Sequence, residues 1–88
     1  DEAGRLEIFK VHTRKRPLQK GVKLADYLKD TDGCTGAEIE AVCNRAAILA
    51  IREFSKTGKD QSAFVIKPSH FSHAVLDVRA NTSHTSNL

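Results

Sequence analysis

Apolar residues recur along the chain in four stretches, which polar segments containing Pro or Gly separate. The clearest stretch covers residues 36–56, where the apolar positions follow the 3.6-residue period of an α-helix. Thr35 and Glu38 stand at its beginning with the spacing of a capping box, so we expect the helix to begin there. The breadth of the stripe indicates a central helix. Its members are Ile39, Val42, Cys43, Ala46, Leu49, Ala50 and Phe54, widened by Ala47, Ile48 and Ile51.

The chain before this stretch predicts two shorter helices. Residues 1–14 begin with acidic side chains and lead into a basic run, an order that the helix dipole favours. Pro17 prevents this helix from continuing. Leu24 and Leu28 are spaced to share one face of a short second helix over residues 24–29.

The chain after the central stretch predicts one more helix. Residues 63–66 form a short apolar run, which predicts either a brief extended segment or an apolar anchor. Pro68 suits the first position of a fourth helix, because its fixed φ and missing amide proton cost nothing there. The apolar face ends near Arg79, and residues 80–88 are expected to be a disordered polar tail. The predicted fold is all-α, with four helices over residues 1–79 and a short extended segment before the last.

Composition narrows the class of protein. The chain has 88 residues, of which 40% are hydrophobic and 28% charged, which allows one globular domain with a modest core. Cys34 and Cys43 are too few for a disulfide scaffold and favour a reducing environment. The first residues lack the order of a signal peptide, and no apolar run approaches the ~20 residues that span a bilayer. We therefore expect an intracellular, cytoplasmic protein without a membrane segment.

The net charge is +3, and the chain has one concentrated basic cluster. Its members are Arg14, Lys15, Arg16, Lys20 and Lys23. A solvated helix end explains such a cluster, and contact with an acidic surface of a partner is the alternative. Nucleic-acid binding is less favoured, because no aromatic side chain is interleaved with the cations. The sequence leaves open whether Arg14-Lys15-Arg16 contacts a partner.

The other reactive side chains predict no separate site. His70 and His73 share one helical face, but no third ligand is evident, so we expect no metal site. No basic neighbour in the sequence activates either thiol, and Cys43 is expected in the core.

The segment Asp32-Gly-Cys-Thr-Gly-Ala-Glu-Ile39 is the main candidate for ligand contact. A capped helix start that carries Gly36 and Ala37 exposes backbone amides with almost no side-chain bulk. A planar or phosphate-bearing ligand can approach such a backbone closely. The same pattern also occurs in helices that are simply well capped.

An ordered set of short motifs gives this segment a context. The motifs are Arg5-Leu6-x-Ile8-x-x-x-His12, Pro17-Leu18, Val22-x-Leu24, Thr31-x-Gly33-x-Thr35-Gly36-Ala37-Glu38-Ile39, Val42-Cys43-x-x-Ala46-Ala47, Ala50-Ile51-Arg52-Glu53 and His70-Phe71-x-x-Ala74-Val75-x-x-Val78. With these motifs in this order, the chain resembles the C-terminal helical lid of AAA+ ATPases from Arg5 to about Arg79. The lid of the second ATPase domain of valosin-containing-protein-like unfoldases is most similar, and proteasomal regulatory ATPases carry related lids.

The resemblance implies a role beside a nucleotide. It implies that Ile8 packs against the base of ATP or ADP and that His12 approaches the base or ribose. Gly36 and Ala37 would line the nucleotide, with Ala37 standing where other AAA+ proteins carry a second-sensor Arg. Such a lid closes over adenosine and couples nucleotide state to neighbouring subunits of a protein-unfolding ring, commonly a hexamer. Its partners would be the large nucleotide-binding subdomain of the parent chain, adjacent subunits and an adaptor or assembly factor.

Two departures and several absences qualify what the resemblance implies. Lys23 replaces an Asp that often caps the second helix, and Lys67-Pro68 replaces a Thr-led start of the last helix. The chain has no GxxxxGK[ST] loop, and no acidic strand end that would hold Mg²⁺. We therefore expect no catalytic residue here, no hydrolysis by these residues alone and no tight binding of ATP or ADP to them.

Two other functions remain open. The chain could be the lid of a proteasomal regulatory ATPase that serves as a docking site for an assembly factor. It could also be a stand-alone basic helical module that binds nucleic acid or an acidic protein.

Overall fold

The structure, a computed structural model, describes residues 1–86, and side chains are described through Asn81. Within these residues the chain is helical and contains no named strand. Its elements in chain order are α1 (Glu2–Thr13), the 3₁₀ helix η1 (Leu24–Tyr27), α2 (Gly36–Ser55), the 3₁₀ helix η2 (Gln61–Ala63) and α3 (Pro68–Ser86). The predicted all-α class is confirmed.

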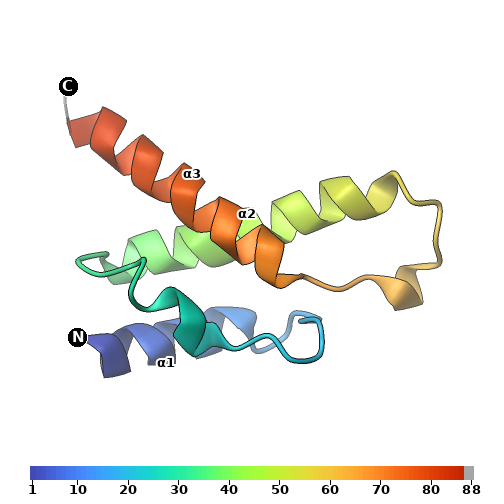
Figure 1. Ribbon diagram of the computed structural model, residues 1–88, viewed down its shortest axis with the longest axis horizontal. Helices are drawn as coiled ribbons and strands as arrows, with labels where there is room; N and C mark the ends of the chain where they lie inside the picture. The colour runs from blue at the N-terminus through green and yellow to red at the C-terminus, as the bar shows by residue number, and fades with distance from the viewer. Residues whose placement is uncertain (87–88) are drawn as a thin grey trace.

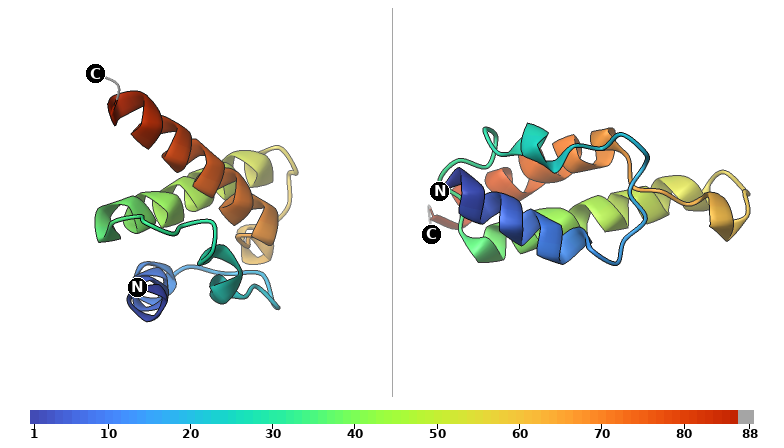
Figure 2. Two further views of the ribbon diagram at one scale, coloured as in Figure 1. Left: turned by 60° about the vertical axis from the view of Figure 1, so that its left-hand side comes forward. Right: turned by 90° about the horizontal axis from the view of Figure 1, so that it is seen from below.

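The central position of α2 is also confirmed. α2 crosses the middle of the molecule and packs against both α1 and α3, while η1 contacts α1 and α3 (Figure 1). The views in Figure 2 show that α1 lies along one half of α2 and that the other half extends past the end of α1. The start of α2 therefore lies beside α1.

The ends of the first two long helices follow from local sequence. Asp1 caps α1 by accepting a hydrogen bond from the amide of Gly4 at 2.7 Å. Thr35 and Glu38 form the predicted capping box at the start of α2. Ser55 is the last residue of α2 and Lys56 is its C-cap, which agrees with the helix end predicted near Lys56.

The predicted second helix is shorter than expected, so residues 1–86 form three α-helices rather than four. Only Leu24–Tyr27 is helical, as a single 3₁₀ turn. Lys23 occupies its N-cap and makes no side-chain capping bond, as its replacement of Asp suggested. One turn without a cap cannot recover the cost of helix nucleation on its own. The turn persists because Tyr27 and Leu28 are buried in the core.

The end predicted for the last helix is wrong, because α3 continues past Arg79 to Ser86. No Gly or Pro follows Arg79 to stop the helix, and Ala80 is a strong helix former. The boundary that we predict between residues 79 and 80 therefore coincides with no break in the helix. Of the predicted tail, residues 87–88 lie outside the described part of the chain.

The run before α3 is both extended and anchored. The first residue of this run, Ala63, is the last residue of η2. Further along, Ile66 forms a parallel bridge with Leu18. The amide of Ile66 donates to the carbonyl of Pro17 at 2.8 Å, and the amide of Gln19 donates to the carbonyl of Ile66 at 2.8 Å. The side chain of Ile66 is 1% exposed. Both alternatives for this segment are therefore realised together.

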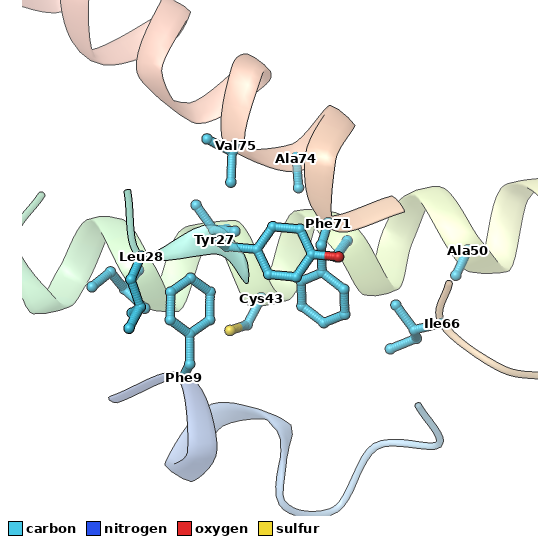
Figure 3. Close-up of a cluster of buried hydrophobic side chains, with 12 residues drawn as sticks. Phe9, Tyr27, Leu28, Cys43, Ala50, Ile66, Phe71, Ala74 and Val75 are labelled. Atoms are coloured by element: carbon cyan, nitrogen blue, oxygen red, sulfur yellow. The ribbon is translucent and has the colours of Figure 1, made fainter. Parts of the chain in front are cut away.

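The core lies between α1, α2 and α3 and is completed by η1, which packs against α1 and α3; its central side chains are shown in Figure 3. The ring of Tyr27 stacks on that of Phe71 with centroids 5.3 Å apart, and Phe9 approaches Tyr27 from α1 at 6.4 Å. The hydroxyl of Tyr27 donates to the carbonyl of Pro68 at 3.3 Å. A residue from η1 thus joins α1 to α3 through the core.

Candidate functional site

Ile8 and Gly36 meet where α1 crosses the start of α2. A Cβ atom placed on Gly36 would lie 3.3 Å from Cδ1 of Ile8, which is closer than carbon atoms normally approach. Gly36 has a helical backbone, so its missing side chain matters here for space and not for an unusual φ. The two predicted residues therefore form one surface, with a bare backbone beside a half-buried apolar side chain.

His12 lies one helical turn beyond Ile8 and faces α2 in the same way. Its Nδ1 is 3.8 Å from Oε2 of Glu40, which lies one turn beyond Gly36. The side chain of His12 is 31% exposed and that of Glu40 is 52% exposed. At this distance the pair attracts electrostatically when His12 is protonated but does not form a hydrogen bond.

The capping box organises the backbone at the start of α2. The amide of Glu38 donates to Oγ1 of Thr35 at 3.1 Å, and the amide of Thr35 donates to Oε1 of Glu38 at 2.8 Å. Helix geometry gives the first-turn amides no acceptor within the helix, and the box engages that of Glu38. Gly36 and Ala37 are exposed residues, so their amides can donate hydrogen bonds to water or to a ligand.

The four predicted site residues thus occupy one region, which we call the α1–α2 face: Ile8, His12, Gly36 and Ala37. Three of them lie along the seam between the helices, and Ala37 follows Gly36 on the exposed side of α2. The positive end of a 20-residue helix favours an anion or a ligand dipole at this point. Glu40 is the member of this region that sequence reasoning missed.

Two arginines hold the segment that leads into α2. From α1, the buried Arg5 donates from Nη2 to the carbonyl of Leu28 at 2.9 Å, and its Nη1 lies 3.7 Å from Oδ1 of Asp32. From α3, Nη1 of Arg79 donates to the carbonyl of Asp32 at 3.0 Å and contacts Sγ of Cys34 at 3.1 Å. The position of the α2 start therefore depends on both outer helices.

The two cysteines have different surroundings. Cys43 is buried as predicted, and burial raises the pKa of its thiol to about 11, so it stays protonated and unreactive. Cys34 is half-buried and does have a basic neighbour, Arg79, contrary to the sequence prediction. The neighbour was invisible because Arg79 is distant in the sequence and comes from another helix.

Arg16 does not belong to the solvated basic cluster. Its Nη1 donates to the carbonyl of Cys43 at 2.6 Å and its Nη2 to Oδ1 of Asn44 at 2.6 Å. Arg16 therefore fastens the loop after α1 to the middle of α2. The remaining cations of the cluster are exposed, namely Arg14, Lys15, Lys20 and Lys23.

His70 has a structural role at the start of α3. Its Nδ1 accepts a hydrogen bond from the amide of Lys67 at 2.9 Å, which places the proton of the neutral ring on Nε2, 3.3 Å from Oε1 of Glu53. The Nζ of Lys67 also bonds this oxygen at 3.3 Å. That bond holds the pKa of Glu53 below its ordinary value.

The described part of the chain has neither a metal-binding cluster nor a membrane-spanning helix. Among the side chains that the structure describes, those of residues 1–81, no group of three or more His, Cys, Asp or Glu is arranged to hold a metal ion. His73 lies 3.6 Å from Asp77 on its own helix. No helix within residues 1–86 combines the length and apolar character that crossing a membrane requires.

Comparison with known proteins places the chain in a context. The family described as the AAA+ lid domain matches residues 22–66. The cell division cycle protein 48 homologue of Archaeoglobus fulgidus is 40% identical over 86 residues, which cover 90% of this chain and 12% of that protein. The proteasome-activating nucleotidase of Methanocaldococcus jannaschii is 55% identical over 53 residues, covering 60% of this chain and 12% of that protein.

A third relative extends the range of parent proteins. The ATP-dependent zinc metalloprotease FtsH 2 of a Thermoanaerobacter species is 52% identical over 58 residues, covering 65% of this chain and 11% of that protein. The chain thus spans about one-eighth of the length of the curated relatives it matches.

Proposed function

Because this chain belongs to the AAA+ lid domain family, we propose that it closes over the adenosine of ATP or ADP in a longer ATPase. In this role the α1–α2 face forms one wall of a nucleotide site, and another domain supplies the other wall. The names of two relatives, a nucleotidase and an ATP-dependent protease, support nucleotide as the ligand.

The contact between Ile8 and Gly36 is the observation that carries this proposal. Any side chain on Gly36 would occupy the space that the bare backbone leaves next to Cδ1 of Ile8. An apolar side chain beside exposed amides suits a purine nucleoside, whose ring is planar and whose sugar and phosphates accept hydrogen bonds. The residues present therefore fit a nucleotide, although Mg²⁺ and the groups that activate water would come from elsewhere in the ATPase.

Each residue of the face has a distinct task in this proposal. Ile8 offers apolar contact to the base, and His12 offers a ring nitrogen to the base or ribose. Gly36 and Ala37 offer backbone amides and exclude bulk. With Ala37 at this position, the lid senses nucleotide through packing and backbone contacts, without a cation directed at the γ-phosphate.

Closure would be transmitted to the rest of the assembly by the rigidity of the helical unit. All three α-helices pack around one core, which includes Phe9, Ile39 and Phe71, each fully buried. A unit packed in this way moves as a body, so a shift at the α1–α2 face displaces the distant end of α3 as well. We propose that this motion links nucleotide state to neighbouring subunits of a protein-remodelling ring.

The extent of the matches favours one subfamily. The cell division cycle protein 48 homologue matches 90% of this chain, whereas the nucleotidase and the metalloprotease match 60% and 65%. A match over nearly the whole chain supports a lid of the valosin-containing-protein-like type.

Ala37→Trp in the complete ATPase tests the proposal. The indole would fill the space next to Gly36 and is expected to weaken ATP affinity by about tenfold or more, because loss of a close ligand contact costs at least ~1.4 kcal/mol. Ala63→Trp is the matched control, since Ala63 is an exposed residue of η2 on the connection after the far end of α2. Isothermal titration with ADP and steady-state hydrolysis would both report the effect. Unchanged affinity in Ala37→Trp would remove the α1–α2 face from the nucleotide site.

A further inference from the structure

The segment between η1 and α2 contains a bridged glycine. Gly33 has φ +82°, a conformation that few residues other than Gly adopt readily. The single Nη1 atom of Arg79 contacts the residue on each side of it, the carbonyl of Asp32 at 3.0 Å and Sγ of Cys34 at 3.1 Å. The guanidinium therefore bridges the two residues that flank a glycine in the left-handed conformation.

This bridge lies immediately before the capping box. Cys34 is followed by Thr35, whose side chain and amide both take part in the box. The amide of Cys34 donates to the carbonyl of the fully buried Thr31 at 3.0 Å, which ties the other end of the turn to the core. Fixing residues 32–34 consequently fixes the direction in which α2 begins.

We propose that Arg79 is a positioning residue, which holds the turn before α2 and thereby sets the backbone of Gly36 and Ala37 for nucleotide. Arg79 projects from α3, so this bridge connects the last helix to the turn that leads into the α1–α2 face. The functional half of this inference rests on the proposed nucleotide site, whereas the structural half does not.

Hydrogen exchange in the 88-residue chain tests the structural half. In Arg79→Ala, exchange of the Cys34 and Thr35 amides is expected to accelerate about two- to fivefold, the effect of losing one partly solvated hydrogen bond. Arg52→Ala is the matched control, because it removes an equal charge from an exposed position of α2. Equal exchange in Arg79→Ala and in the unmodified chain would overturn the proposal.

Steady-state kinetics in the complete ATPase test the coupling to nucleotide. Arg79→Ala is expected to raise KM for ATP about two- to fivefold with kcat unchanged, because the wall is displaced but the catalytic groups are not. A general loss of folded protein would instead lower kcat at constant KM, and that result would overturn the proposal. Faster exchange together with an unchanged KM would also overturn the coupling.

The failure of the two proposals can be told apart. If Ala37→Trp leaves nucleotide affinity intact, the proposed nucleotide face is wrong, and the exchange result for Arg79 stands by itself. If Ala37→Trp weakens affinity and Arg79→Ala changes neither exchange nor KM, only the inference about Arg79 is wrong.

Discussion

Filling the space at Gly36 should affect stability in a way that depends on Ile8. In Gly36→Ala the new Cβ would meet Cδ1 of Ile8 at 3.3 Å, and Ile8 is half-buried and able to yield by a few tenths of an ångström. Replacing Gly by Ala in a helix contributes up to ~1 kcal/mol in the interior and less in the first turn. The two effects nearly cancel, so we expect a change within about 0.5 kcal/mol.

Gly36→Val should behave differently, because its two γ-carbons extend beyond the position that Ile8 can vacate. Such overpacking costs about 1–3 kcal/mol. Ile8→Val removes Cδ1, which is the atom that clashes with the new side chain. As a single substitution it should lower the free energy of unfolding by about 0.5–1.5 kcal/mol. In the double variant the cost of Gly36→Val should fall by about 1 kcal/mol, a coupling typical of residues in contact.

Urea unfolding followed by circular dichroism would measure the four corners of this cycle. Gly36→Ala, alone and with Ile8→Val, provides the matched control for the bulk of the added side chain. If Gly36→Val costs the same with Ile8 and with its Val replacement, within about 0.3 kcal/mol, the contact between Ile8 and Gly36 is not the source of the strain. The spatial argument for the α1–α2 face would then lose its basis.

Three further predictions follow from other parts of the structure. Thr35→Ala should destabilise the chain by about 1 kcal/mol in urea unfolding, and Thr35→Ser, which keeps the hydroxyl, should recover most of this; equal losses would argue against the cap. At pH 8 an alkylating reagent should modify Cys34 in the folded chain and spare Cys43, whose pKa is about 11, as peptide mass mapping would show. Because the folded pKa of Glu53 is lowered, the carboxylate stabilises the fold above its unfolded-state pKa, and the contribution disappears as pH falls through the folded value. Acid titration should therefore show Glu53→Gln less stable than the unmodified chain near neutral pH and equal to it in strong acid; a constant difference would contradict the pairing.

Local signals allowed much of the fold to be predicted. The period of α2, the capping box at Thr35 and the helix start at Pro68 each depend on neighbours within one or two turns, and the structure has all three. The end of α3 was mispredicted because its apolar face ends near Arg79 while its backbone has no reason to stop. The face and the length of a helix are different properties, and only the face is visible as a pattern.

The length of η1 shows the converse case. Leu24 and Leu28 have the spacing of an α-helix, yet only one 3₁₀ turn forms. Tertiary burial of Tyr27 fixes this segment, and burial of one large ring between α1 and α3 does not require a second turn. A local period therefore overestimates the length of an element that is stabilised by the burial of only two side chains, Tyr27 and Leu28.

In the candidate site, the contacting residues could be predicted from the sequence, whereas the contacts that position them could not. Ile8, His12, Gly36 and Ala37 could be selected from the sequence because a resemblance named them, and the structure brings them to one region. Their positions, however, depend on Arg5, which binds the carbonyl of Leu28 at the end of η1, and on Arg79, which binds the carbonyl of Asp32 in the turn before α2. Contacts from a side chain to a distant carbonyl leave no period in the sequence.

The site cannot be transferred to another helix by its contacting residues alone. A capped helix start with Gly and Ala is common, and the capping box alone fixes only the first turn of α2 relative to itself. The direction of that turn relative to Ile8 depends on Arg79, which bonds Asp32 and Cys34, and on Arg5, which bonds Leu28 and pairs with Asp32. Grafting residues 32–39 without both arginines should therefore reproduce the cap but lose the close approach of Gly36 to Ile8. The nucleotide face that we propose is accordingly a property of the three packed helices, although its contacting residues come from two short segments.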